Sequence, residues 1–67
     1  SARGVFRAKL HNLGVQFAIS VTDERWEQAI ITGEEIMRDY PNSRMSLEVQ
    51  QKMPQLRARA AEAANPK

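Results

Sequence analysis

Large apolar residues recur along the first part of the chain at the spacing of a helix. Phe6, Leu10, Leu13 and Phe17 follow one another at steps of four, three and four residues, which places them on one helical face. No proline interrupts this stretch. The pattern predicts a helix over residues 3–20 that buries this face.

A second amphipathic pattern begins with recognisable start signals. Thr22 has the side chain of a good N-cap, and the acidic residues after it favour the positive end of a helix. Val21 is placed to contact Trp26 as a hydrophobic staple. These signals predict a helix over residues 23–40. Its predicted buried stripe is Trp26, Ala29, Ile30, Gly33, Ile36, Met37 and Tyr40.

Two glycines lie on the predicted buried faces, Gly14 in the first helix and Gly33 in the second. Glycine inside a helix costs about 1 kcal/mol relative to alanine, so each is expected where a neighbouring helix comes close. We therefore expect the first two helices to form a tight pair at these glycines.

The rest of the chain predicts a third helix over residues 44–64. Pro41 ends the second helix, and Asn42 or Ser43 can cap the third. Pro54 lies inside the third helix and predicts a kink. The predicted buried stripe of this helix is Met45, Val49, Met53, Leu56, Ala60 and Ala63.

The predicted fold is all-α. It is an antiparallel helical hairpin followed by a third, proline-kinked helix, and the short connections favour an up-down-up arrangement. A chain of 67 residues forms one domain at most, with a core worth about 3–5 kcal/mol. We expect this domain over residues 3–64 and a flexible tail over residues 65–67.

The composition leaves few kinds of chemistry open. The chain has no cysteine and a single histidine, His11, so we expect no disulfide, no metal site and no nucleophile–histidine pair. Glu34 and Glu35 are adjacent on a helix and point apart, so they do not form a carboxylate pair. We therefore expect no enzyme, no catalytic residue and no cofactor. No apolar run is long enough to cross a membrane, and no signal-peptide pattern is present, which favours a soluble segment, cytoplasmic or periplasmic.

Charge is segregated along the sequence. The net charge is +2 and the isoelectric point is about 9.5. Charged residues are basic before Asp23, mostly acidic from there to Pro41, and mostly basic afterwards, an alternation that would attract successive helices to one another. The alternative is a nucleic-acid-binding surface whose affinity falls steeply with salt. Its residues would be Arg3, Arg7, Lys9, Arg57 and Arg59.

Part of the chain resembles the tetratricopeptide repeat. The Leu13 and Gly14 pair, the aromatic Phe17, the small Ala29 and the closing Pro41 follow the pattern of that repeat. The stretch IMRDYPNS at the end of the second helix is similar to bacterial tetratricopeptide proteins of the outer-membrane assembly lipoprotein type. The resemblance implies a TPR-like helical hairpin that mediates protein contacts, in a fragment of a larger bacterial protein.

The sequence departs from the repeat pattern in several places, and Gly33 and Ile36 stand where the second helix of the repeat normally carries an aromatic residue and an alanine. Gly14 and Ala29 are about three residues further apart than in a standard repeat, so we expect an extended turn around residues 20–23. No Leu-Gly pair occurs at Gln50 and Gln51, where a second repeat needs one. The third helix is therefore expected to cap the array.

The resemblance also marks candidate partner-binding residues, because the first helix of each tetratricopeptide repeat lines the ligand groove. The corresponding residues here are Ala8, His11, Val15, Ala18 and Ile19, with Arg3 and Arg7 at the rim. Independently of the resemblance, Val15 and Ile19 are apolar and lie off the predicted buried face. The alternative is that these residues pack under the third helix.

These patterns favour a protein–protein interaction or self-association module. The expected partner is a protein, a peptide or a second copy of the chain, and nucleic acid is not expected. Two alternatives stay open: the basic nucleic-acid-binding domain, and a ligand-free end cap of a longer repeat array.

Overall fold

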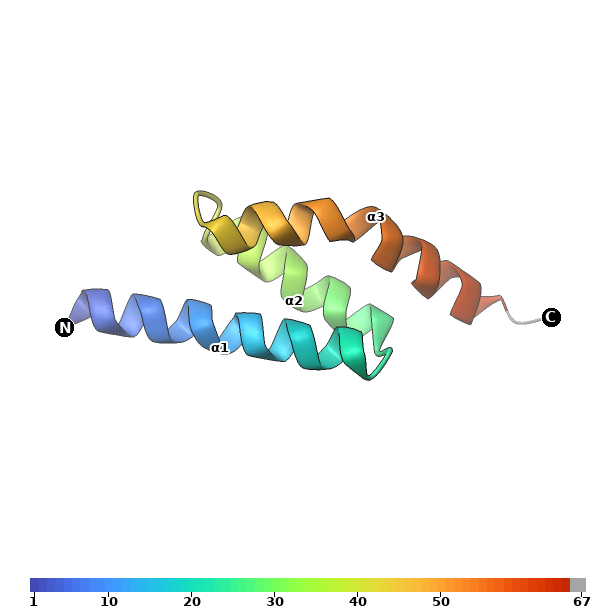
Figure 1. Ribbon diagram of the computed structural model, residues 1–67, viewed down its shortest axis with the longest axis horizontal. Coiled ribbons are helices and arrows are strands. Elements are labelled where there is room, and N and C mark those ends of the chain that lie inside the picture. The colour runs from blue at the N-terminus through green and yellow to red at the C-terminus, as the bar shows by residue number, and fades with distance from the viewer. Residues whose placement is uncertain (66–67) are drawn as a thin grey trace.

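The structure is a computed structural model that describes residues 1–65. It contains three helices, α1 over Ala2–Thr22, α2 over Trp26–Asp39 and α3 over Arg44–Ala64. The chain runs along α1, returns along α2 and turns again into α3 (Figure 1). The predicted all-α, up-down-up fold is confirmed, and α3 has the predicted bounds. Residues 66–67 of the predicted tail lie outside the described residues.

Helix α2 is the centre of the packing. It packs against both α1 and α3, whereas α1 and α3 have few contacts with each other. The helices are also offset, so that the first turns of α1 extend past one end of α2 and the last turns of α3 past the other (Figure 1). The molecule is therefore elongated, with extents of 51 × 19 × 14 Å.

The hydrophobic core lies where the three predicted stripes meet along α2. Its buried members are Phe17, Ala29, Ile30, Ile36, Val49, Met53, Leu56 and Ala60, all of them on the predicted stripes. The prediction is wrong for Phe6, which is 53% exposed, and for Ala63, which is also exposed. Both lie on the overhanging ends of their helices. Phe6 contacts Tyr40 edge to face, with the ring centroids 4.8 Å apart.

The glycines of α1 and α2 make room for side chains of α3. A methyl group added at Gly14 would meet the end of the Met45 side chain. A methyl group added at Gly33 would lie 2.9 Å from Val49 Cγ1 and 3.1 Å from Phe17 Cε1. The expectation that the two glycines pair the backbones of α1 and α2 is therefore wrong, because side chains occupy the space at both positions.

Helix α1 ends two residues later than predicted. It runs through Thr22, so Thr22 does not cap α2, and the extended turn predicted over residues 20–23 is wrong. Helix α2 begins later than predicted, at Trp26, and its N-cap residue Arg25 makes no side-chain capping hydrogen bond. The residues that separate this chain from the repeat pattern therefore lengthen α1 instead of the turn.

The turn between α1 and α2 is a Schellman motif. The Arg25 N–H donates to the Ser20 carbonyl at 2.8 Å, and the Glu24 N–H donates to the Val21 carbonyl at 3.1 Å. Glu24 has a φ of 59°, the left-handed conformation that glycine usually provides at this position. The turn therefore satisfies the last carbonyls of α1 at the cost of local strain at Glu24.

The start of α3 follows the sequence prediction. Ser43 caps the helix: its Oγ accepts a hydrogen bond from the Ser46 N–H at 3.0 Å and donates one to the Tyr40 carbonyl at 2.7 Å. Helix α3 continues through Pro54 without interruption, and its ribbon changes direction partway along (Figure 1). This agrees with a bend rather than a break at the proline.

Candidate functional site

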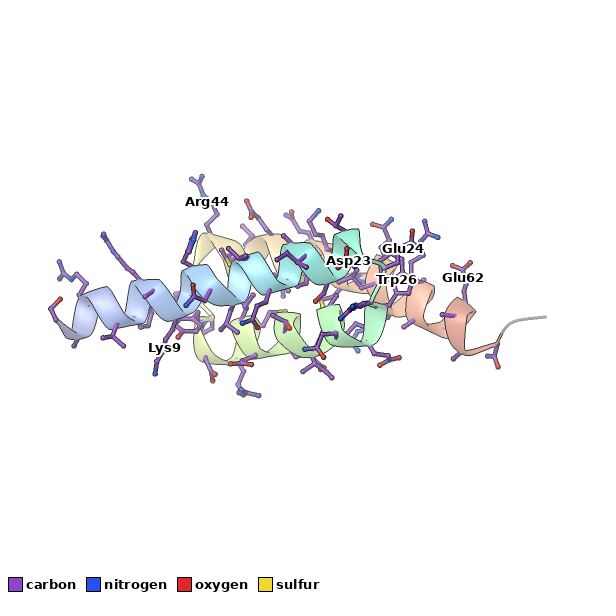
Figure 2. All side chains as sticks on the ribbon, turned by 90° about the horizontal axis from the view of Figure 1, so that it is seen from below. Lys9, Asp23, Glu24, Trp26, Arg44 and Glu62 are labelled. Atoms are coloured by element: carbon purple, nitrogen blue, oxygen red, sulfur yellow. The ribbon has the colours of Figure 1, made fainter. Side chains whose placement is uncertain are left out.

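Ala18 borders a groove between α1 and α3, whereas Ala8, Val15 and Ile19 lie on the side of α1 that faces away from α2 and α3. Figure 2 looks onto this side, with α1 in front of the other two helices. Val15 is 43% exposed and Ile19 is 55% exposed, so neither packs under the third helix. Ala8, His11 and Ala18 are exposed as well. All five predicted residues are therefore accessible, and Ala8, Val15 and Ile19 share one side of α1.

The structure adds three residues that sequence reasoning missed. Val5, Asn12 and Thr22 are exposed, and their spacing places them on the same side of α1 as Val15 and Ile19. Their helical spacing is present in the sequence. It is hard to recognise there, because α1 carries apolar residues both on its core face and on the opposite side. We define the outer face of α1 as Val5, Ala8, Asn12, Val15, Ile19 and Thr22.

An apolar groove of about 320 Å³ runs beside the outer face, between α1 and α3. It is lined by Gly14, Phe17, Ala18, Val21, Thr22, Met45, Glu48, Val49 and Lys52. The groove exists because α1 and α3 have few direct contacts. Ala18 and Thr22 border it on the α1 side, so a partner on the outer face would also pass close to the groove.

The two ends of α1 differ in charge, because its first turns are basic and acidic residues follow its last turn. Arg3, Arg7 and Lys9 are exposed on its first turns, and no acidic residue precedes Asp23. Asp23 and Glu24 lie at the opposite end, far from Lys9 along the helix (Figure 2). The predicted rim residues Arg3 and Arg7 are thus accessible, but they stand at one end of the surface and do not surround it.

The other cations of the nucleic-acid alternative lie on α3 and have partners. Arg57 forms an exposed ion pair with Glu34, with an Nη2 to Oε2 distance of 3.5 Å. The Arg59 guanidinium lies over the Trp26 ring, 5.6 Å from the centroid. Both residues lie on α3, whereas Arg3, Arg7 and Lys9 lie on the first turns of α1. The five basic residues therefore do not form one patch.

One further ion pair lies at the end of α2. Arg38 Nε is 3.0 Å from Asp39 Oδ1, and both side chains are exposed. Hydrogen bonds from Arg38 lower the pKa of the Asp39 carboxyl, and the same hydrogen bonds raise the pKa of Arg38. The opposite charges of these two neighbours are paired with each other at the surface.

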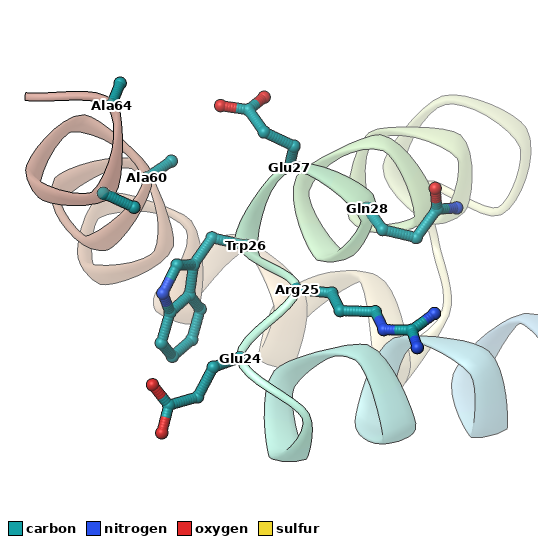
Figure 3. A pocket seen from close by; sticks show the side chains of 8 residues that line it. Glu24, Arg25, Trp26, Glu27, Gln28, Ala60 and Ala64 are labelled. Atoms are coloured by element: carbon teal, nitrogen blue, oxygen red, sulfur yellow. The ribbon is translucent and has the colours of Figure 1, made fainter.

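A hollow of about 500 Å³ lies where the start of α2 meets the last turns of α3. The Trp26 ring projects toward α3, whereas Arg25 and Gln28 point away from the ring (Figure 3). Glu24 and Glu27 lie on opposite sides of the ring in this view. Polar groups that bind a small ligand converge on one point, and these do not. Trp26 packs partly against the core, as predicted.

Within residues 1–65, no three His, Asp or Glu side chains are placed to hold a metal ion. No helix in the same range is both long and apolar enough to cross a membrane. Comparison with known protein families, with curated proteins and with solved structures found no match. The tetratricopeptide resemblance and the expectation that the chain is not an enzyme therefore stay predictions.

Proposed function

We propose that this chain is a protein–protein interaction module that binds a helical segment through the outer face of α1. The observation that carries the proposal is the exposure of Val15 and Ile19 on a side of α1 that neither α2 nor α3 covers. Apolar residues gathered on an exposed surface are typical of interaction sites, whereas single exposed apolar residues are common everywhere.

A helix is the partner structure that this surface fits best. The outer face is a stripe along one helix of 21 residues, with apolar side chains at helical spacing. A partner helix laid along α1 would bury Val15 and Ile19 at the centre of the contact, with His11 at its rim. Arg3 and Arg7, the other predicted rim residues, lie at seven-residue spacing from Leu10 and Gly14 and therefore on the core side of the first turns of α1. This function needs no catalytic residue and no cofactor.

The structure bears differently on the two alternatives. A nucleic-acid surface needs cations gathered along one face, and the five candidate basic residues are divided between the first turns of α1 and the second half of α3. In a ligand-free end cap, the apolar side chains on the outer face of α1 would instead pack against a preceding repeat, and the peptide experiment below separates the two interpretations.

The proposal is tested by selecting helical peptides that bind the wild-type domain from a displayed library, and then measuring their affinity for variants. The double substitution Val15→Asp and Ile19→Asp places two charges in the proposed contact, and should weaken binding at least about tenfold, because a buried unpaired charge is costly. Circular dichroism should show unchanged helicity, since both positions are exposed.

The matched control is Ile31→Asp, because Ile31 is 56% exposed on α2, away from the outer face. Selected peptides should bind this variant as well as the wild type. The assigned surface is wrong if they keep their affinity for the doubly substituted protein, or if they lose it for Ile31→Asp.

A further inference from the structure

Helix α1 contributes little to the buried core. Within residues 1–65, Phe17 is the only core residue that belongs to α1, whereas α2 and α3 supply the other seven. Leu10, Leu13 and Val21 of α1 pack against this core and are only partly buried. Helix α1 also has few contacts with α3. Of the three helices, α1 is therefore the one that separates from the others at the lowest cost.

The turn that joins α1 to α2 is short and has two unfavourable features. It consists of residues 23–25. Glu24 is left-handed, with a φ of 59°, which is unfavourable for any residue that carries a side chain. Arg25 makes no side-chain capping hydrogen bond, so its side chain leaves the first N–H groups of α2 uncapped. The turn therefore opposes the close packing of α1 on α2.

A straight helix through the turn would remove both features. Residues 23–25 are Asp, Glu and Arg, so neither proline nor glycine prevents a helix there. In a continuous helix over residues 2–39, Glu24 would have an ordinary helical φ. The N–H groups of residues 26–28 would then donate to the carbonyls of residues 22–24. The local geometry of the turn thus favours a straight helix, and the packing of α1 opposes it.

We propose that two copies of the chain exchange α1, so that α1 of each copy packs on α2 and α3 of the other. In the exchanged dimer, α1 and α2 of each copy form one helix over residues 2–39, about 57 Å long at about 1.5 Å per residue. The two long helices lie antiparallel, so each α1 is still antiparallel to the α2 that it contacts, as in the single chain (Figure 1). Phe17 of one copy fills the space beside Gly33 of the other.

The structure itself identifies the partner surface, because the exchanged α1 makes the contacts that it makes within one chain. The packing is the same in both forms, so the turn decides between them, and a higher protein concentration favours the dimer. The exchange uses the core side of α1 and leaves Val15 and Ile19 exposed. It therefore goes beyond the proposed function and does not rest on it.

Substitutions at Glu24 test the exchange, because they change the turn and not the packing. Glycine adopts the left-handed φ without strain and weakens a continuous helix, whereas alanine does the opposite in both respects. Each protein is refolded from urea at about 1 mM, and size-exclusion chromatography measures its dimer fraction. The wild type should give a dimer. The dimer Kd of Glu24→Ala should be lower than that of Glu24→Gly by at least about a hundredfold, since both turns of the dimer contribute.

Two outcomes of this experiment overturn the exchange. One is that the wild type and Glu24→Ala give only monomers, and the other is that the two Glu24 variants have the same Kd. The double substitution Val15→Asp and Ile19→Asp is the control for association through the outer face of α1. It should form the exchanged dimer as the wild type does, and a loss of the dimer would also contradict the exchange.

Disulfide trapping shows which copy each α1 packs on, because the chain has no cysteine of its own. The end of the Met45 side chain on α3 lies at Gly14 of α1, so Gly14→Cys and Met45→Cys in the same chain bring two thiols together. Dimer and monomer fractions are separated, oxidised and compared on a denaturing, non-reducing gel. The exchanged dimer should stay covalently linked, and the monomer should form an internal disulfide. A dimer fraction that releases single chains with internal disulfides associates through another surface, and overturns the exchange.

Discussion

Side chains from α1 and α3 both pack against Gly33 of α2, and the substitution Gly33→Ala tests this packing. The added methyl group would lie 2.9 Å from Val49 Cγ1, and 3.1 Å from both Met53 Sδ and Phe17 Cε1. Val49 is buried and β-branched, so its side chain has little freedom to turn away. The substitution therefore forces α1 and α3 to shift relative to α2.

The magnitude follows from two opposing effects. Overpacking a core lowers the free energy of unfolding by about 1–3 kcal/mol, whereas replacing a glycine within a helix by alanine raises it by about 1 kcal/mol. Since neighbours on two helices must move together, the overpacking penalty should fall in the upper part of this range. The net loss of stability should then be about 1–2 kcal/mol. For a domain of this size that loss lowers the melting temperature by roughly 5–15 °C.

Gly14→Ala is the matched control. The neighbours of its added methyl group both belong to the end of Met45, which is partly exposed and flexible. Met45 can move aside at little cost, so this variant should gain up to about 1 kcal/mol from helix propensity. Thermal and urea unfolding, followed by circular dichroism, measure both variants.

The two glycine variants should change stability in opposite directions. If Gly33→Ala is as stable as the wild type, the close approach of Val49, Met53 and Phe17 at this position is wrong. If Gly14→Ala loses as much stability as Gly33→Ala, Met45 is held rigidly and the packing of α3 on α1 is tighter than described.

Three further predictions concern the caps, the turn and the charges. Ser43→Ala should cost about 1 kcal/mol in urea unfolding, because it removes the cap of the Ser46 N–H, whereas Ser1→Ala at the exposed start of α1 should cost much less. Glu24→Gly should stabilise the protein by about 1 kcal/mol, because glycine adopts the left-handed backbone without strain, whereas Glu24→Ala should not. A gain in stability from both substitutions would show that removal of the carboxylate, and not relief of backbone strain, is the cause. Titration with duplex DNA should show no salt-sensitive binding; an affinity that falls by powers of ten with added salt would favour the nucleic-acid alternative.

Much of the fold could be predicted because its signals are local. The stripes of α2 and α3 are well separated from their polar faces, so helical spacing identifies their buried residues. Asn42 and Ser43 follow a proline that ends the preceding helix, which limits the cap of α3 to these two residues, and the structure assigns it to Ser43. Spacing also places Val15 and Ile19 off the face that contains Phe17, but whether the third helix covers them depends on tertiary packing.

The wrong predictions depend on contacts between distant residues or on competing local signals. Phe6 has the spacing of a core residue, but its burial depends on how far α2 extends alongside α1, which no local pattern determines. Thr22 is a good N-cap by residue type, yet the Schellman turn after it lets α1 continue through this position. Gly14 and Gly33 signal close approach without indicating which helix approaches. Side chains of α3 fill the space at both positions, and at Gly33 Phe17 of α1 joins them.

The most direct test of the proposed interaction surface is the amide NMR spectrum of the wild-type domain, recorded while a selected helical peptide is added. The account predicts that the peptide shifts the amide signals of the outer face of α1, including those of Val15 and Ile19, while those around Ile31 and Leu47 stay unchanged. Signals that shift chiefly around Ile31 and Leu47 would contradict it.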